Sequence, residues 1–412
     1  MTLLSLAGRG TDAPDSPYSW LRLSIALAFG TLGGAGMWSV VVVLPAVQAE
    51  FGVLRAEASL PYTLTMLGFA FGGVLMGRLS DRFGILVPAL VGAVTLSAGY
   101  VLSAYAATLW QFAILYGLFV GIGTSVTFGP LMADVSHFFA RRRGIAVAVC
   151  ASGNYVAGAL WPPVVQHFTA SAGWRATHVG IGIFCIIVLI PIALLMRRRP
   201  THAEETPAVA AARLSARDLG LSPNQLQALI CIAGVACCVA MSMPQVHIVA
   251  YCGDLGYGVA RGAEMLSLML AFGIVSRVAS GFVADKLGGV ATLLIGSALQ
   301  GLALFLYLWF DGLASLYVIS ALFGLFQGGV VPSYAIIVRE YFPPREAGTR
   351  VGLAIMATLF GMAFGGWMSG YIFDLTGSYQ AAFLHGIAWN LLNVTIAAWL
   401  LMRPKGRVMA AA

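Results

Sequence analysis

The sequence GRLSDRFG at residues 77–84 recurs as GFVADKLG at residues 281–288, 204 positions further along the chain. Each copy follows an apolar stretch and has the pattern G-x-x-x-D-[RK]-x-G, with an acid followed by a base between two glycines. Self-similarity at a fixed offset indicates two copies of one structural unit. A looser repeat joins residues 138–144 to residues 341–348, where an aromatic pair precedes an arginine and a glycine. We therefore expect two structurally similar halves.

The composition excludes a water-soluble protein. Of the 412 residues, 59% are apolar and 9% are charged, whereas soluble domains average about 25% charged residues. A surface with so few charges must be solvated mainly by lipid. At about 20 residues per crossing, the chain accommodates roughly a dozen transmembrane helices and no large domain outside the membrane. A soluble enzyme, a disordered chain and a secreted protein are therefore excluded.

Twelve apolar segments are long enough to cross the roughly 30 Å hydrocarbon layer as helices. They occupy residues 21–46, 58–77, 86–107, 110–134, 144–168, 177–196, 225–252, 262–283, 290–310, 313–338, 349–372 and 381–402. A polar stretch with several prolines interrupts them, as expected of a linker. The predicted domains are a tail at 1–20, a six-helix bundle at 21–197, the linker at 198–223, a second six-helix bundle at 224–402 and a tail at 403–412.

The distribution of basic residues predicts the orientation in the membrane. The net charge is +7, and Lys and Arg are enriched in cytoplasmic loops. With a cytoplasmic N-terminus, all but four of the 23 basic residues lie in inner loops, at inner helix ends or in the tails. Arg55, Arg175 and Arg261 lie outside, and Arg277 lies within a span. We therefore expect both termini in the cytoplasm and no nucleic-acid partner.

The repeated motif and the long middle linker resemble the major facilitator superfamily of secondary transporters. More narrowly, AEFG at 49–52 with Arg55, the stretch 139–144 with its arginine run, and GWR at 173–175 resemble the monocarboxylate porter and oxalate/formate antiporter group. The resemblance implies an all-α membrane protein with twelve helices in two pseudo-symmetric six-helix bundles. It also implies that Arg277 occupies the position of the group's substrate arginine. No P-loop is apparent, so gradients rather than ATP must supply the energy.

Arg277 is a candidate binding residue on physical grounds as well. A charged side chain at the membrane centre costs at least about 2.5 kcal/mol on insertion scales, so it is a functional candidate by default. Its place before Asp285 puts it within about 6 Å of the middle of its span. There the planar guanidinium could bind a carboxylate through paired hydrogen bonds. The alternative is a structural arginine bonded to helix carbonyls or to a buried acid.

The absence of a second buried cation favours a substrate with one carboxylate. Oxalate-type exchangers of the family carry a lysine in span eleven, where this chain has only Arg350, at the cytoplasmic start. A dianion would therefore leave a net charge to be desolvated. Animal-type porters carry an acid one turn before the arginine and a lysine in span one, whereas this chain has Gly273 and no such lysine. A proton-coupling group must then be a different residue.

Four further side chains are candidates for substrate contact, namely Asn154, Tyr116, His247 and Trp38. Asn154 and Tyr116 could donate hydrogen bonds to the substrate, although such residues also hold helices together. Trp38 could form an apolar wall or be an ordinary helix contact. His247 is the candidate for proton coupling because imidazole titrates near physiological pH. The alternative is an interfacial or packing histidine.

The repeated motif concerns conformational switching rather than substrate binding. In the superfamily its acid and base are understood to bridge neighbouring helices at the cytoplasmic side and to lock the outward-facing state. The resemblance assigns this gating role to Gly77, Asp81, Arg82, Gly84, Gly281, Asp285, Lys286 and Gly288.

These observations predict a secondary transporter of small organic anions, most favourably monocarboxylates such as lactate or pyruvate, by proton symport or anion exchange. The alternatives are an efflux transporter for larger hydrophobic compounds, a dicarboxylate or formate antiporter, and a membrane sensor. We expect a multi-pass protein of the cell membrane, of the bacterial inner-membrane type, that acts as a monomer. The six cysteines show no metal spacing, and we expect no metal, cofactor or enzymatic activity.

Overall fold

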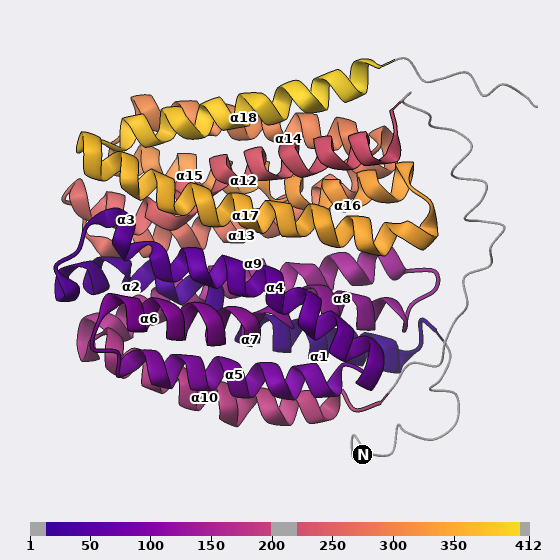
Figure 1. Ribbon diagram of the computed structural model, residues 1–412, viewed down its shortest axis with the longest axis horizontal. Helices are drawn as coiled ribbons and strands as arrows, with labels where there is room; N and C mark the ends of the chain where they lie inside the picture. Colours follow the sequence, from indigo (N-terminus) through magenta and orange to yellow (C-terminus); the bar gives the residue numbers. More distant parts are fainter. Residues whose placement is uncertain (1–13, 199–220, 404–412) are drawn as a thin grey trace, which may run out of the picture.

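The computed structural model describes residues 14–198 and 221–403, whose regular structure is helical (Figure 1). Twelve helical segments within these residues are long and apolar enough to cross a membrane. The predicted all-α fold class and the predicted number of spans are thereby confirmed. The predicted tails, in their parts 1–13 and 404–412, and most of the predicted linker, residues 199–220, lie outside the described residues.

Several spans consist of more than one helix. The first half holds α1 (Pro17–Gly33), α2 (Ala35–Phe51), α3 (Arg55–Ala58), α4 (Leu60–Phe83), α5 (Leu86–Ala104), α6 (Leu109–Leu115), a π-helical turn (Tyr116–Val120), α7 (Gly121–Ser125), α8 (Gly129–Ser136), α9 (Arg143–Ala172) and α10 (Trp174–Leu195). The second half holds α12 (Pro223–Asp254), α13 (Val259–Leu287), α14 (Gly289–Trp309), α15 (Leu313–Gln327), α16 (Val330–Tyr341), α17 (Pro344–Thr376) and α18 (Tyr379–Met402). The first span, Pro17–Phe51, extends beyond the predicted 21–46 because helical hydrogen bonding continues past the apolar residues.

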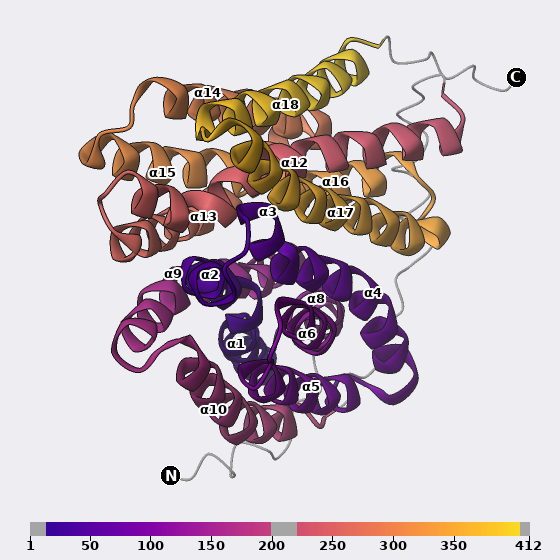
Figure 2. The same cartoon turned by 60° about the vertical axis from the view of Figure 1, so that its left-hand side comes forward.

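The two halves form separate bundles that lie side by side, as Figure 2 shows. They meet mainly where α9 packs against α13 and where α4 packs against α17. Small residues allow this close approach, because a Cβ on Gly158 would lie 2.2 Å from Leu270 Cδ1, and one on Gly366 would lie 3.2 Å from the Tyr62 ring. Packing of small residues is a usual basis of helix association in membranes, where lipid is as apolar as the helices.

The sequence repeat corresponds to a repeated helix ending. α4 is followed by Gly84 with a φ of 78°, and α13 is followed by Gly288 with a φ of 86°. Both glycines have a ψ of 168°. The Gly84 N–H donates to the Ser80 carbonyl and the Gly288 N–H donates to the Ala284 carbonyl, each over 2.8 Å. A positive φ is readily adopted by glycine and is strained for most other residues. The last glycine of each motif therefore has a conformational role.

Two spans are interrupted at corresponding places in the two halves. Span four breaks at residues 126–128, between α7 and α8, and span ten breaks at Gly328 and Gly329, between α15 and α16. Span one has a similar interruption at Gly34, between α1 and α2. Non-helical backbone inside a membrane is tolerated where it is buried in protein or lines a cavity. Discontinuous helices also mark binding sites in several transporter folds. The breaks therefore indicate the middle of the bundle as the location of a candidate binding site.

Arg22, which we expected among the charges at the inner end of the first span, is buried. Its side chain is 0% exposed inside the first bundle, and its Nε and Nη2 atoms donate to Asp134 Oδ2 over 2.9 and 2.8 Å. Arg22 lies in the second turn of α1, which begins at Pro17, and opposite α8. The ion pair allows both charges to be buried, since each one satisfies the other.

The substitution Asp134→Ala is expected to destabilise the protein, because it leaves the Arg22 guanidinium buried without a counter-ion. Loss of one partner of a buried pair costs about 3–5 kcal/mol. Replacing both residues by leucine removes both charges and is expected to recover most of that loss. Thermal unfolding of the purified protein in detergent measures both effects. Equal melting temperatures for wild type and Asp134→Ala would contradict a stabilising role of the pair.

Candidate functional site

Arg277 lies in α13, about 15 Å of helix rise from the end of that helix at Leu287. Its side chain is 7% exposed. The Nη1 atom donates to the Ala151 carbonyl over 2.8 Å, and Nε donates to the Gly328 carbonyl over 3.3 Å. Within residues 14–198 and 221–403, no ion pair involves this guanidinium. Arg277 is therefore a buried cation that is held by neutral groups. Its two hydrogen bonds to carbonyls are also those expected of a structural arginine, the alternative given in the sequence analysis.

Three features of the sequence make this arrangement possible. The Tyr155 ring of α9 lies against the guanidinium, with 4.2 Å between Arg277 Cζ and the ring centroid. Gly273 leaves room for that ring, because a Cβ there would lie 2.7 Å from Tyr155 Cε1. The break in span ten leaves the Gly328 carbonyl available as an acceptor. Ala151 and Tyr155 belong to the first half and Gly328 to the second, so the guanidinium bridges the two bundles.

Asn154 and Trp38 lie beside this bridge. Trp38 Nε1 donates to Asn154 Oδ1 over 3.0 Å and to the Asn154 carbonyl over 3.1 Å. The Trp38 ring packs on Gly158, where a Cβ would lie 2.9 Å from ring atom Cε2. Since a Cβ on the same glycine would also meet Leu270 of α13, Trp38 belongs to the contact between the two halves. The structure therefore joins two of the predicted site residues, Asn154 and Trp38, to each other, and Asn154 precedes Tyr155, whose ring lies on Arg277.

Tyr116 and His247 lie away from Arg277. The Tyr116 hydroxyl is buried within the first bundle, where it donates to the Gly36 carbonyl over 2.9 Å and lies 2.7 Å from Ser39 Oγ. His247 is buried in the C-terminal half of α12, and its Nε2–H donates to the Gly366 carbonyl over 2.8 Å. The His247 Nδ1 atom has no partner among the described residues. A role for either residue in binding or proton coupling stays a prediction.

At the end of the bundle that the distribution of basic residues predicts to face outward, here called the outer end, a group of polar contacts joins the two halves, and the sequence analysis missed it. Arg55 Nη2 lies 3.0 Å from Asp254 Oδ2, and Arg55 Nη1 donates to the Tyr379 hydroxyl over 2.7 Å. The backbone N–H groups of Arg55 and Ala56 donate to the Asp374 carboxylate over 2.8 and 2.7 Å. We call these contacts the outer latch. The signal for it was present, because Arg55, Asp254 and Asp374 are charges of opposite sign at predicted outer helix ends.

At the opposite end, the charged residues of the repeated motif form no such connection. Asp81, Arg82, Asp285 and Lys286 are exposed, and no ion pair among the described residues includes any of them. The contacts between α4 and α17 include the hydrogen bond from Thr63 Oγ1 to the Ala363 carbonyl over 3.2 Å toward the outer end and, near the middle of both helices, the Phe71 and Phe360 rings with centroids 5.9 Å apart. The bundle is therefore fastened across its halves at the outer end, and the inner-end motif is unpaired.

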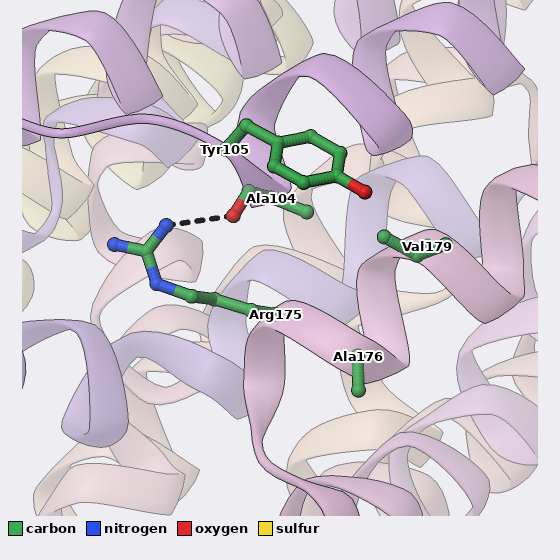
Figure 3. Close-up of a pocket in the computed structure, with 5 residues that line it drawn as sticks. All are labelled: Ala104, Tyr105, Arg175, Ala176 and Val179. Atoms are coloured by element: carbon green, nitrogen blue, oxygen red, sulfur yellow. Dashed lines mark hydrogen bonds between the residues drawn. The ribbon is translucent and has the colours of Figure 1, made fainter.

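Glu50, Trp174 and Arg175, three of the residues that carry the family resemblance, fasten span one to span six within the first half. Arg175 Nη2 lies 2.7 Å from Glu50 Oε1, and Trp174 Nε1 donates to the same carboxylate. Figure 3 shows the Arg175 guanidinium directed to the Ala104 carbonyl, at 2.6 Å, in a hollow lined by Ala104, Tyr105, Arg175, Ala176 and Val179. Because Arg175 already has these partners, this hollow is not the candidate binding site.

The model of the Major Facilitator Superfamily matches residues 26–317 and 280–410. The chain belongs to this superfamily. Its fold is also that of a solved bacterial homologue of the human lysosomal transporter Spinster in an inward-facing and occupied conformation. The two structures superpose with a TM-score of 0.73 at 15% identity, over 94% of this chain and 97% of that one.

Two curated relatives support the narrower resemblance to the monocarboxylate group. Monocarboxylate transporter 13 of Bos taurus is 27% identical over 380 residues, which make up 90% of this chain and 87% of the relative. Monocarboxylate transporter 11 of Homo sapiens is 25% identical over 392 residues, or 90% of this chain and 80% of the relative. The protein is therefore a multi-pass membrane transporter that resembles the monocarboxylate group.

Breaking the outer latch is expected to expose the contact between the halves at the outer end. In a variant without the native cysteines, Thr63→Cys places a thiol in that contact. Adding Arg55→Ala is expected to raise its rate of maleimide labelling in detergent by roughly three- to tenfold, because an ion pair and a hydrogen bond between the halves are lost.

The matched control for the latch is Arg261→Ala. Arg261 is also an outer arginine, but it is exposed and pairs with Glu264 of its own helix at 3.0 Å. Its removal is expected to leave the labelling rate of the Thr63→Cys thiol unchanged. Equal rates in the Arg55→Ala variant and in its parent would contradict the latch.

Proposed function

We propose that the protein is a secondary active transporter of small organic anions, most favourably monocarboxylates, and that Arg277 binds the substrate carboxylate. The observation that carries the proposal is a buried guanidinium with no carboxylate partner among the described residues. A buried charge is costly unless it is paired. The names of the relatives in the monocarboxylate group support the same class of substrate.

The carboxylate binds by replacing weaker acceptors. Arg277 donates to the carbonyls of Ala151 and Gly328. A carboxylate offers two charged oxygens that match the guanidinium fork, and charge-assisted hydrogen bonds are roughly twice as strong as neutral ones. Because Ala151 belongs to the other half, its release removes a bond between the halves. Substrate binding thereby frees the bundles to move relative to each other.

One carboxylate is the favoured charge of the substrate. One other buried arginine, Arg22, is paired with Asp134 at 2.8 Å. Arg350 of span eleven pairs with Glu346 at 2.7 Å. Neither cation is therefore available to neutralise a second carboxylate near Arg277. A dianion bound there would carry a buried negative charge without a partner, which is unfavourable.

Proton symport and anion exchange are the two modes of energy coupling that fit this site. A monoanion bound to Arg277 forms a neutral pair, so the loaded transporter can reorient without moving a net charge through lipid. No carboxylate lies beside Arg277 within the described residues to carry a coupled proton. His247 remains the titratable candidate, in the outer part of α12.

Uptake by proteoliposomes tests the role of Arg277. Arg277→Ala is expected to lower monocarboxylate uptake by at least about 30-fold, because it removes one partner of a buried charge pair. Arg277→Lys retains the charge without the planar fork, and its uptake is expected to lie between that of wild type and that of Arg277→Ala. Arg261→Ala is the control with an exposed arginine. Unchanged uptake in Arg277→Ala would contradict the binding role and would favour an efflux transporter for larger hydrophobic compounds.

An imposed pH gradient separates the two modes of coupling. If the protein is a symporter, an inward proton gradient increases uptake into vesicles without internal anion. If it is an exchanger, uptake stays constant across the gradient and depends on internal anion. For a symporter that uses His247, His247→Ala is expected to abolish the response to the gradient. A response equal to that of wild type would exclude His247 as the coupling group.

A further inference from the structure

His247 is a buried histidine with one nitrogen that has no partner. Its side chain is 0% exposed, and it lies seven residues before Asp254, or about 10 Å of helix rise below the outer latch. The Gly366 carbonyl, at 2.8 Å, can only accept a hydrogen bond, so Nε2 carries the hydrogen. In the neutral imidazole the lone pair is then on Nδ1, which has no partner among the described residues. A proton can therefore bind His247 only at Nδ1.

Tyr379 lies between His247 and the outer latch. Its ring centroid is 6.2 Å from that of His247. At the far end of the side chain, its hydroxyl accepts from Arg55 Nη1 over 2.7 Å and donates to Asp254 Oδ2 over 3.1 Å. The Tyr251 ring, one helical turn beyond His247 on α12, packs against the Tyr379 ring with centroids 4.9 Å apart. The latch therefore holds Tyr379 over His247 on the outer side.

The groups around His247 include no counter-ion for a protonated imidazole. Besides Tyr379, Tyr251 and the latch residues Arg55, Asp254 and Asp374, the packed elements bring Tyr62 of α4 and, on α13, Arg261 and Glu264. Among the described residues, no hydrogen bond or ion pair joins an acid to the imidazole. Asp254 is bonded to Arg55, Asp374 to two backbone N–H groups, and Glu264 to Arg261.

A formed latch therefore requires a neutral His247. Protonation of Nδ1 would bury a charge and an N–H donor without an acceptor, which is unfavourable. The Arg55 guanidinium, which also contacts Tyr379, has the same sign as the added charge. When the latch breaks, Arg55 leaves with the first half and Tyr379 is released, so water can reach Nδ1 and solvate the proton. Because protons bind this second state better, they shift the population toward it.

We propose that His247 and the outer latch form one pH-sensitive switch, in which Tyr379 covers the proton site while the latch is formed. Proton binding at Nδ1 and formation of the latch exclude each other, so a lower pH at the outer face favours the broken latch. The switch assigns His247 an action on the latch rather than on the substrate. It concerns the outer end alone and does not depend on the binding of a carboxylate at Arg277.

Chemical modification tests whether Tyr379 covers His247. Diethyl pyrocarbonate acylates accessible neutral imidazoles, and mass spectrometry of peptides locates the product. At neutral pH in detergent, His247 of wild type is expected to resist modification while the exposed His167 reacts. Arg55→Ala is expected to raise the rate at His247 by roughly three- to tenfold, because an ion pair and a hydrogen bond between the halves are lost.

Tyr379→Leu is a second variant, which removes the covering ring and keeps Arg55. It is expected to raise the rate at His247 as well. Arg261→Ala is the matched control and is expected to leave the rate at the wild-type value, because Arg261 pairs within its own helix. Reaction of His247 in wild type as fast as that of His167 would contradict the cover, and so would equal protection in wild type, Arg55→Ala and Tyr379→Leu.

The pH dependence of the outer end tests the coupling. In a variant without the native cysteines, spin labels on Tyr105→Cys and Phe310→Cys report the separation of the halves, since both positions are exposed at outer helix ends. Distances are measured by electron resonance at pH 8 and pH 5.5, on either side of the ordinary imidazole pKa of about 6.5. The ratio of the wide to the narrow population is expected to rise about fivefold at the lower pH, the lower range for coupling between two sites.

His247→Gln is the decisive variant, because glutamine keeps an N–H donor for the Gly366 carbonyl and binds no proton. It is expected to lose the pH response. A response equal to that of wild type would assign the pH dependence to the latch carboxylates Asp254 and Asp374 and overturn the role of His247. A wild type without any response would overturn the switch. Neither measurement involves transport, so unchanged uptake in Arg277→Ala would contradict the proposed function and leave the switch standing.

Discussion

The structure depends on how a positive charge is held in the middle of an apolar bundle. Arg277 meets two backbone carbonyls and an aromatic ring rather than an acid. These groups solvate the guanidinium, but they do not cancel its charge. In a low-dielectric interior, an uncancelled charge attracts an anion strongly and selectively. This uncancelled charge is the observation on which the proposed binding of an anion rests.

The fold holds the Arg277 guanidinium through features of the backbone rather than through charged partners. Gly273 admits the Tyr155 ring, and the break in span ten supplies the Gly328 carbonyl. Both features depend on glycine, which permits close contacts and irregular backbone that larger residues obstruct. The first half contributes Ala151 and Tyr155, so the charge lies at the contact between the two bundles.

The two ends of the bundle differ in a way that suits alternating access. The outer latch joins Arg55 of the first half to Asp254 and Asp374 of the second. The inner motif residues Asp81 and Asp285 are exposed and unpaired within the described ranges. A transporter with two states needs contacts that form at one end when those at the other end break. Among the described residues, charged contacts therefore join the halves at the predicted outer end and not at the repeated motif.

The sequence by itself determined the twelve spans, the two-fold repeat and the exceptional place of Arg277, because apolar length, motif spacing and charge are properties of local sequence. Only the tertiary structure decided the partners of the charges. Arg22 and Asp134 are 112 residues apart in the chain, and Arg55 and Asp254 are 199 apart. The Tyr379 ring beside His247 and the Tyr155 ring on Arg277 likewise depend on which helix faces pack together. Helix rotation and crossing set such contacts, and a single sequence does not specify them locally.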